Sequence, residues 1–266
     1  MCNMRHDTAH NRAILREMIS TDFKIRYQGS FLGYLWSLLR PLFMFVILYY
    51  VFTYVIPLGK SVPHYAVQLF LGIILWNFFN EATTTGLGSI ASSGDIIRKV
   101  SIPRYLIVIA SSVSALINLF LNLIVLLVFV AADGVAFRVE WFLLPLIILE
   151  VFIFAQALAF ILAAANARFR DVQYIWELII QVGFYATPII YIAAKIPKEY
   201  LTYFLLNPMA QMIQDARWMV VGGDSITLWS RAGLLGMAVP LTIIATVSVT
   251  AVFYFKSASK TFAEDV

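Results

Sequence analysis

Long apolar segments dominate this chain, and six of them are long enough to cross a membrane. A transmembrane helix needs about 20 apolar residues. The segments cover residues 38–56, 65–85, 105–132, 141–165, 172–193 and 232–255. They are apolar all round, unlike the roughly ten-residue alternating strands of a membrane β-barrel. The pattern therefore predicts an all-α membrane protein with a six-helix transmembrane domain over residues 38–255.

A different pattern precedes the first span. Within residues 12–26, Ile14, Leu15, Met18 and Ile19 recur at three- and four-residue spacing, while Arg16 lies on the opposite face. This pattern predicts an amphipathic helix lying in the membrane interface, inside an N-terminal segment over residues 1–37. The helix either only anchors the chain to the membrane or also binds a partner through its polar face. The pattern is compatible with both alternatives.

The connection between the fifth and sixth spans is long and apolar. Residues 195–230 have helical periodicity but are interrupted at Asn207-Pro208 and turn at Gly222-Gly223. Irregular backbone survives at membrane depth only against protein or a cavity. We therefore expect a re-entrant hairpin of two short helices in the outer leaflet, and the alternative is a peripheral external hairpin.

Composition agrees with a membrane protein. The 266 residues are 61% hydrophobic and 13% charged, against about 25% charged residues in soluble domains. The net charge of +4 is typical of basic cytoplasmic loops, so nucleic acid is not expected as a partner. The single cysteine, Cys2, excludes a disulfide framework or a cysteine-based metal site. The polar N-terminus is unlike a cleavable signal peptide.

The distribution of arginine and lysine predicts the orientation, because basic residues collect on the cytoplasmic side. Both termini, including a tail over residues 256–266, are expected in the cytoplasm. The cytoplasmic set is Arg5, Arg12, Arg16, Lys24, Arg26, Arg40, Arg98, Lys99, Arg104, Arg168, Arg170, Lys256 and Lys260; the external set is Lys60, Arg138, Lys195, Lys198, Arg217 and Arg231.

The chain carries little chemistry of its own. Its spans contain Glu81, Glu150 and Glu177, of which only Glu150 lies well inside, and a lone glutamate is more typical of structure than of ion coupling. Gly59-Lys60 is the only partial match to a phosphate-binding loop, on the external side. No histidine-based metal motif is present either. The chain is therefore predicted not to be an enzyme and to bind neither cofactor nor metal.

Two further features suggest interactions. Aromatic residues make up 15% of the chain; many are explained by membrane belts, but their faces can also stack on sugar rings along a passage. Residues 94–104 read as a short helix ended by Pro103, with apolar positions that a simple basic loop does not explain. Such a helix on the cytoplasmic face can dock into a soluble partner.

Several motifs resemble those of the membrane subunits of type-2 ABC exporters, and most closely the permeases that export O-antigen, capsule or teichoic-acid polymers. The motifs are Arg26-Tyr27, residues 32–36 with Pro41, residues 97–104, the segment 166–172, Thr187-Pro188 with residues 189–191, and residues 207–209. Their order and spacing agree with the family over nearly the whole chain.

The resemblance implies a homodimer in the bacterial cytoplasmic membrane, working with two copies of a separate ATPase that binds ATP and magnesium. It implies a polyprenyl-linked glycan as substrate. The implied coupling residues are Arg12, Arg16, Lys24, Asp95, Arg98, Lys99 and Arg104. The implied entrance and channel residues are Arg26, Tyr27, Tyr34, Trp36, Arg40, Trp76, Tyr185 and Tyr191, with Arg26 and Arg40 facing a pyrophosphate. The implied external gate is Tyr203, Phe204, Asn207 and Pro208, and a loop motif holds Arg168, Arg170 and Asp171.

The sequence is compatible with two other functions. A type-2 permease for small lipophilic substrates has the same number of spans. A membrane scaffold without transport needs no ATPase, so co-purification with an ATPase distinguishes it from a permease.

Overall fold

The computed structural model describes residues 11–21, 33, 35–56, 59–60, 62–94, 102–191, 193, 196–223, 225–260 and 262. Residues 11–21 are helical. The later elements are α2 (Leu35–Tyr50), the π-helical η1 (Val51–Val55), α3 (Tyr65–Ser92), α5 (Tyr105–Ala132), the 3-10 helix η2 (Val139–Leu143), α6 (Leu144–Arg168), α7 (Val172–Ala186), α8 (Lys198–Leu205), α9 (Pro208–Val221) and α10 (Leu228–Ala258). The described part of the chain contains no strand, which confirms the all-α prediction for those residues.

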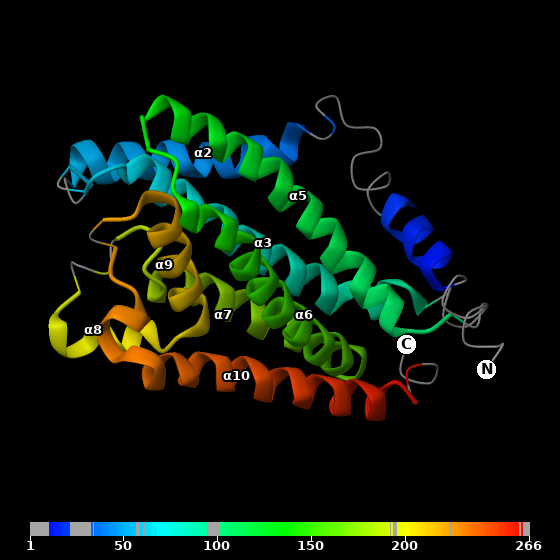
Figure 1. The fold of residues 1–266 in the computed structure, drawn as a ribbon. Helices are drawn as coiled ribbons and strands as arrows, with labels where there is room; N and C mark the ends of the chain where they lie inside the picture. Colours follow the sequence, from blue (N-terminus) through cyan, green and yellow to red (C-terminus); the bar gives the residue numbers. More distant parts are fainter. Residues whose placement is uncertain are drawn as a thin grey trace.

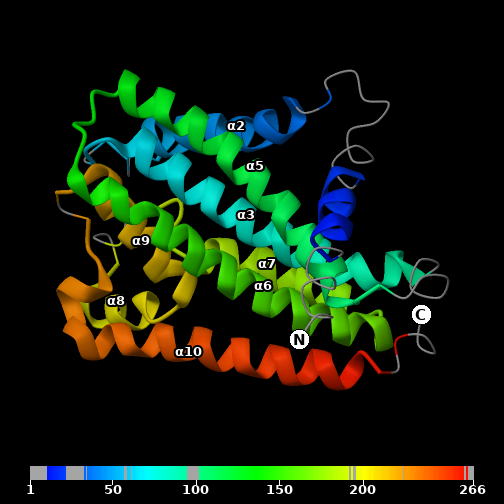
Figure 2. The same ribbon diagram turned by 45° about the vertical axis from the view of Figure 1, so that its right-hand side comes forward.

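The long helices lie side by side and their ends define two ends of a bundle (Figures 1 and 2). The helix over residues 11–21 lies at the same end as the last turn of α10, whereas α8 and α9 lie at the opposite end. The interface helix and the predicted hairpin are therefore separated by the length of the bundle.

Helix α3 forms the centre of the bundle. Leu71, Ile73, Ile74 and Leu75 are almost completely buried although they point in different directions around the helix. A helix that is hydrophobic all round is buried all round. Its main neighbours are α5 and α6, and α2, α7 and α9 also contact it.

Small residues bring α3 and α6 close together. Ala155, Ala159 and Ala163 follow one another at four-residue spacing on α6, and each is fully buried. A Cβ placed on Gly86 of α3 would lie 2.6 Å from the Cβ of Ala159, so only glycine fits there. In a bilayer, helices associate through such close van der Waals packing because lipid supplies no hydrophobic drive between them.

Four of the described helical segments are long and apolar enough to cross a membrane: Leu35–Val55, Arg104–Ala132, Val139–Arg168 and Leu235–Ala258. Helix α3 has 28 residues, but polar residues in its second half make it less apolar. Helix α7 ends at Ala186, so the predicted helix over residues 172–193 is too long. The reason is Pro188, which disfavours helical backbone in the preceding residue, and Thr187 is extended (φ −94°, ψ 137°).

The start of α10 has a break. Thr227 caps the helix, its side chain accepting a hydrogen bond from the Ser230 amide at 3.2 Å. At Gly233 the backbone leaves the helical region (φ 60°, ψ −159°), a conformation suited to glycine. The apolar span therefore begins at Leu235, slightly after the predicted start at residue 232.

Candidate functional site

A polar pocket of about 440 Å³ lies between α2, α3 and α5. Helix α3 supplies Asn77, Asn80, Glu81, Thr84 and Thr85. Their spacing places all five on one face of the helix. Sequence reasoning missed this face because it treated the segment only as a span, although the spacing is visible in the sequence.

Helices α2 and α5 complete the pocket. Trp36 and Arg40, both exposed, lie one turn apart on α2, and Asn118 lies on α5. The Asn118 amide donates to Glu81 Oε1 at 2.7 Å. The structure thus brings together two predicted entrance residues with the amides and hydroxyls of α3. A guanidinium, a carboxylate, an aromatic ring and neutral polar groups suit a hydroxylated ligand, because they offer both hydrogen-bond donors and acceptors.

Helix α7 exposes a second polar surface. Gln173, Glu177, Gln181 and Tyr185 are all exposed and follow one another at four-residue spacing. We call these four residues the α7 polar stripe. Gln173 Nε2 donates to Glu177 Oε1 at 3.1 Å. Polar side chains are expensive in hydrocarbon, so this stripe is suited to face water, a polar substrate or another protein surface.

The opposite face of α7 packs on α3. Trp176 is buried and its Nε1 donates to Thr83 Oγ1 at 3.1 Å. A Cβ on Gly183 would lie 2.9 Å from the Trp76 ring, so Gly183 makes room for that side chain. Packing on this side orients the polar stripe away from the core.

The predicted channel aromatics occupy different environments. Trp76 is 5% exposed and packs against Phe79 and Phe184, so in this chain it belongs to the core. Tyr185 is 63% exposed on the α7 polar stripe. The Tyr191 hydroxyl donates to the Tyr185 carbonyl at 3.1 Å. Two more predicted positions, Tyr27 and Tyr34, lie outside the described residues.

Three of the predicted coupling residues are described: Arg12 and Arg16 on the helix over residues 11–21, and Arg104 before α5. That helix and the start of α5 lie at the opposite end of the bundle from α8 and α9 (Figure 1). Arg12 and Arg16 are exposed on the helix over residues 11–21, while Met18 packs against a buried cluster that includes Phe262. The helix and its amphipathic burial pattern agree with the sequence pattern over residues 11–21, while the coupling role of Arg12 and Arg16 stays a prediction. Arg104 directly precedes α5, and its Cζ lies 5.8 Å from the centre of the Phe262 ring.

Part of the coupling prediction lies outside the described residues. This applies to Lys24, Asp95, Arg98 and Lys99, and also to the entrance residue Arg26. Residues 102–103 are described and are not helical.

The predicted loop motif joins α6 to α7 in a tight turn. Arg168 lies in the last turn of α6, where a cation complements the helix dipole. Its Cζ lies 5.3 Å from the Phe169 ring centre. Arg170 and Asp171 are exposed in the turn. The motif therefore presents two positive charges and one negative charge at the end of the bundle opposite to α8 and α9 (Figure 1).

The predicted gate residues mark the break between α8 and α9. Asn207 caps α9, its Oδ1 accepting from the Met209 amide at 3.1 Å, and its Nδ2 donates to Thr187 Oγ1 at 3.4 Å. Pro208 occupies the first turn, where its missing N–H costs nothing. Tyr203 is 73% exposed, whereas Phe204 is half-buried. The two helices and their break at Asn207-Pro208 are confirmed.

Arg217 on α9 was counted in the sequence only as a cation of the external side, and its burial was not predicted. The side chain is 1% exposed. Its guanidinium donates to three carbonyls: Nε to Gln68 at 3.0 Å, Nη1 to Pro188 at 2.8 Å and Nη2 to Ile189 at 2.5 Å. Burial lowers the pKa of Arg217 to about 10, so the side chain stays charged at neutral pH.

Gly72 makes room for this guanidinium, since a Cβ there would lie 2.9 Å from Arg217 Nη2. Arg217 therefore fastens α9 to α3 and to the turn that follows α7. No signal in a single sequence separates such an arginine from a loop cation.

Glu150 on α6 has an acidic neighbour that the sequence did not reveal, Asp215 on α9, which influences it electrostatically. Gln211 donates from Nε2 to Asp215 Oδ2 at 2.6 Å. Burial raises the pKa of Asp215 to about 6, against the opposing effect of that hydrogen bond. The pair lies where α6 and α9 meet. The described residues contain no cluster of three or more histidine, cysteine or acidic side chains able to hold a metal ion.

Comparisons with known proteins identify the family of the chain. The family model described as ABC-2 type transporter matches residues 15–221. An O-antigen export system permease protein RfbA of Myxococcus xanthus is 30% identical over 261 residues, which cover 96% of each chain. The RfbA protein of Klebsiella pneumoniae is 29% identical over 90% of this chain and 94% of its own. The polysialic acid transport protein KpsM of Escherichia coli is 23% identical over 76% of this chain and 79% of its own. The chain therefore belongs to the ABC-2 type transporter family and is a membrane permease of that family.

Proposed function

We propose that this chain forms the channel of an ATP-driven exporter that moves a lipid-linked polysaccharide across the bacterial cytoplasmic membrane. The relatives named for O-antigen export and polysialic acid transport support the substrate class. The observation that carries the proposal is the α7 polar stripe, because exposed glutamine and glutamate side chains on a membrane helix need a polar neighbour.

Six spans with both termini in the cytoplasm fit this role. Beyond the four apolar spans, α3 and α7 supply the other two crossings. The 15 residues of α7 reach about 22 Å, short of a hydrocarbon core of about 30 Å. The turn after α7 and the hairpin of α8 and α9 would fill the remaining depth. That turn is protected by protein, since Thr187, Ile189 and Ile190 are buried, as non-helical backbone at membrane depth requires.

A second copy of the chain would cover the α7 polar stripe. One subunit presents this stripe on its outside rather than around an enclosed passage. Two copies facing each other would place two stripes, together with the pockets that contain Arg40, around one path. Amides and exposed tyrosine rings suit a sugar polymer, because they offer hydrogen bonds and stacking without demanding one sequence of sugars.

ATP hydrolysis would come from a partner, because the chain has no phosphate-binding loop. Two copies of a cytoplasmic ATPase, which bind ATP and magnesium, would dock at the end that carries Arg12 and Arg16. The turn with Arg168 and Arg170 offers further basic groups near that end.

Cysteine accessibility tests the proposed passage. In a Cys2→Ser background, Gln181→Cys should react with a membrane-impermeant maleimide when the complex is in vesicles. Val249→Cys provides the control, since Val249 is 57% exposed on α10 and is expected to face lipid. Equal protection of both cysteines would refute a water-filled path along α7.

The substrate class needs a separate test. With its ATPase, the reconstituted permease should hydrolyse ATP faster when a polyprenyl-linked glycan is added. Stimulation by small lipophilic compounds, and not by the glycan, would instead favour a permease for small substrates. A purified chain that never binds an ATPase would favour a scaffold.

A further inference from the structure

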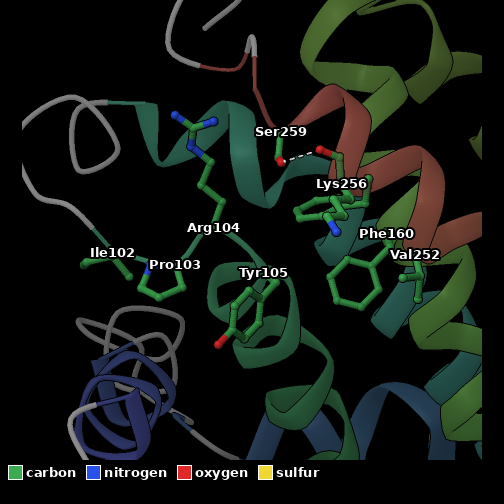
Figure 3. Close-up of a pocket in the computed structure, with 9 residues that line it drawn as sticks. Ile102, Pro103, Arg104, Tyr105, Phe160, Val252, Lys256 and Ser259 are labelled. Carbon is green, nitrogen blue, oxygen red and sulfur yellow. Dashed lines mark hydrogen bonds between the residues drawn. The ribbon is translucent and has the colours of Figure 1, made fainter. Parts of the chain in front are cut away.

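A groove of about 500 Å³ lies at the end of the bundle opposite to α8 and α9, outside the proposed passage (Figure 3). It is bounded by the residues that precede and begin α5, by Phe160 of α6 and by the end of α10. Two of its lining residues are cations, Arg104 and Lys256. The others are Ile102, Pro103, Tyr105, Phe160, Val252, Phe255 and Ser259, so none is acidic.

The groove lies where two candidate spans end. One span starts at Arg104 and the other ends at Ala258, two residues after Lys256. Figure 3 shows the two cations on different walls, Arg104 on the segment that leads into α5 and Lys256 on α10 beside Phe160. Cations at span ends lie at the depth of lipid headgroups, while the apolar walls continue toward the acyl chains.

The groove is also open and rigidly built. Val252 is 61% exposed and Tyr105 is 42% exposed, whereas Phe255 is 7% exposed and packs edge-on against Phe160. The Ser259 hydroxyl donates to the Lys256 carbonyl at 3.0 Å, which ties the last turn of α10 together. An elongated apolar ligand can therefore enter from the side without disturbing the core.

We infer that this groove binds an anionic membrane phospholipid. The phosphate would bind Lys256 and Arg104, whose guanidinium would turn toward the groove from its present position over the Phe262 ring. One acyl chain would lie along Val252 and Phe160. Basic pockets between transmembrane helices on the cytoplasmic side suit anionic headgroups. This inference needs only a membrane protein in this orientation and does not depend on the exported substrate.

The bound lipid would also brace the N-terminal helix. Asn11 Nδ2 donates to the Tyr105 hydroxyl at 3.4 Å, and Tyr105 lines the groove. Met18 packs against the cluster that contains Phe255. A lipid that fixes Tyr105 and Phe255 therefore stabilises the docking of residues 11–21, the segment proposed to meet the ATPase.

The experiment measures lipid retention by the full chain in nanodiscs of phosphatidylcholine with or without phosphatidylglycerol, using native mass spectrometry. Arg104→Gln and Lys256→Gln should each weaken phosphatidylglycerol binding about fivefold, and the double variant about 25-fold. Lys260→Gln is the matched control, because it removes the same charge from an exposed lysine one turn beyond Lys256 and outside the groove. Equal losses in all three single variants would show diffuse surface attraction and overturn the inference.

A second variant tests the apolar part. Val252→Trp fills the groove without changing charge and should also release the lipid; full retention would overturn the proposed acyl-chain position. Polyprenyl phosphate added in competition distinguishes the lipid source. If it displaces phosphatidylglycerol at lower concentration than phosphatidylglycerol itself binds, the groove is a carrier-lipid site and the assignment to a membrane phospholipid is wrong. Hydrogen exchange of residues 11–21 should slow with phosphatidylglycerol in the wild type and not in the double variant.

Discussion

The buried guanidinium of Arg217 gives the sharpest test of how α9 is held. The perturbation is Arg217→Met, which keeps much of the apolar stem but removes all five N–H donors. The wild-type side chain makes hydrogen bonds to the carbonyls of Gln68, Pro188 and Ile189. Each bond to a charged group contributes about 1.5–3 kcal/mol net.

Their full sum overstates the loss. Gln68 lies within α3, where its carbonyl can accept from the helix, and Pro188 O also accepts from Gln214 Nε2 at 3.4 Å. Removing the guanidinium also recovers the cost of burying a charge. We therefore expect Arg217→Met to lower the free energy of unfolding by about 3 kcal/mol. Most of this loss comes from the Ile189 carbonyl, which is left without its donor, and from the lost hydrogen bonds of the planar guanidinium. This is a large fraction of a typical stability of about 5–15 kcal/mol.

The assay is equilibrium unfolding of the full chain in mixed detergent and dodecyl sulfate micelles, followed by tryptophan fluorescence. Arg217→Lys should fall between wild type and Arg217→Met, because one ammonium cannot reach three carbonyls arranged around a planar fork. Gly72→Ala should destabilise through the same contact. Arg231→Gln, an exposed arginine near the same end, is the control. If Arg217→Met unfolds at the same dodecyl sulfate fraction as Arg231→Gln, Arg217 does not fasten α9.

Three more predictions concern packing, pH and transport. Gly86→Ala should destabilise the chain by about 1–3 kcal/mol because its Cβ would meet Ala159, whereas Gly88→Ala, with open space around it, should be neutral or slightly stabilising in the same unfolding assay; equal effects would refute the close contact. Burial raises the pKa of Asp215 from 3.8 to about 6, so the folded chain binds this proton more tightly and stability should fall as pH rises through that window. Asp215→Asn should reduce that fall and stabilise the chain at pH 7 by up to about 3 kcal/mol; an unchanged pH profile would refute it. Gln181→Leu should reduce glycan export several-fold in cells while leaving the unfolding midpoint unchanged, and wild-type export would contradict a role for the α7 polar stripe.

Hydrophobic periodicity predicted the helices well where packing follows directly from it. Residues 105–132 and the amphipathic pattern around Met18 needed no knowledge of neighbours. The break at Asn207-Pro208 also followed from local chemistry, since a capping side chain before a proline favours a helix start. The signal for the end of α7 was equally local, because Pro188 disfavours helix in the residue before it. The predicted helix nevertheless ran to residue 193, because the residues after Pro188 are mostly apolar.

Features that depend on partners in space were not visible in the sequence. An arginine in a sequence does not show whether its side chain is exposed or buried. Arg217 is buried only because α3 and the Pro188–Ile189 turn approach it in space and accept its hydrogen bonds. The proximity of Glu150 and Asp215 involves residues on two helices and depends on the contact between α6 and α9. The face of Asn77, Asn80 and Glu81 was the exception, because its helical spacing can be read without coordinates.

The way α9 is held limits how an external gate can work. Besides the Arg217 anchor, its start is tied by Asn207 to Thr187. Its end is tied by Trp141, whose Nε1 donates to the Val220 carbonyl at 3.1 Å. A helix fixed at its start, middle and end moves with the bundle. The main contacts of α8 are with α9 and α10 alone, whereas α9 also contacts α3 and α6. Elements with fewer packed neighbours open at lower free energy. If the hairpin gates the passage, we therefore expect α8 to move while α9 stays in place. Weakening the Arg217 anchor should then leave the passage partly open rather than hold it closed.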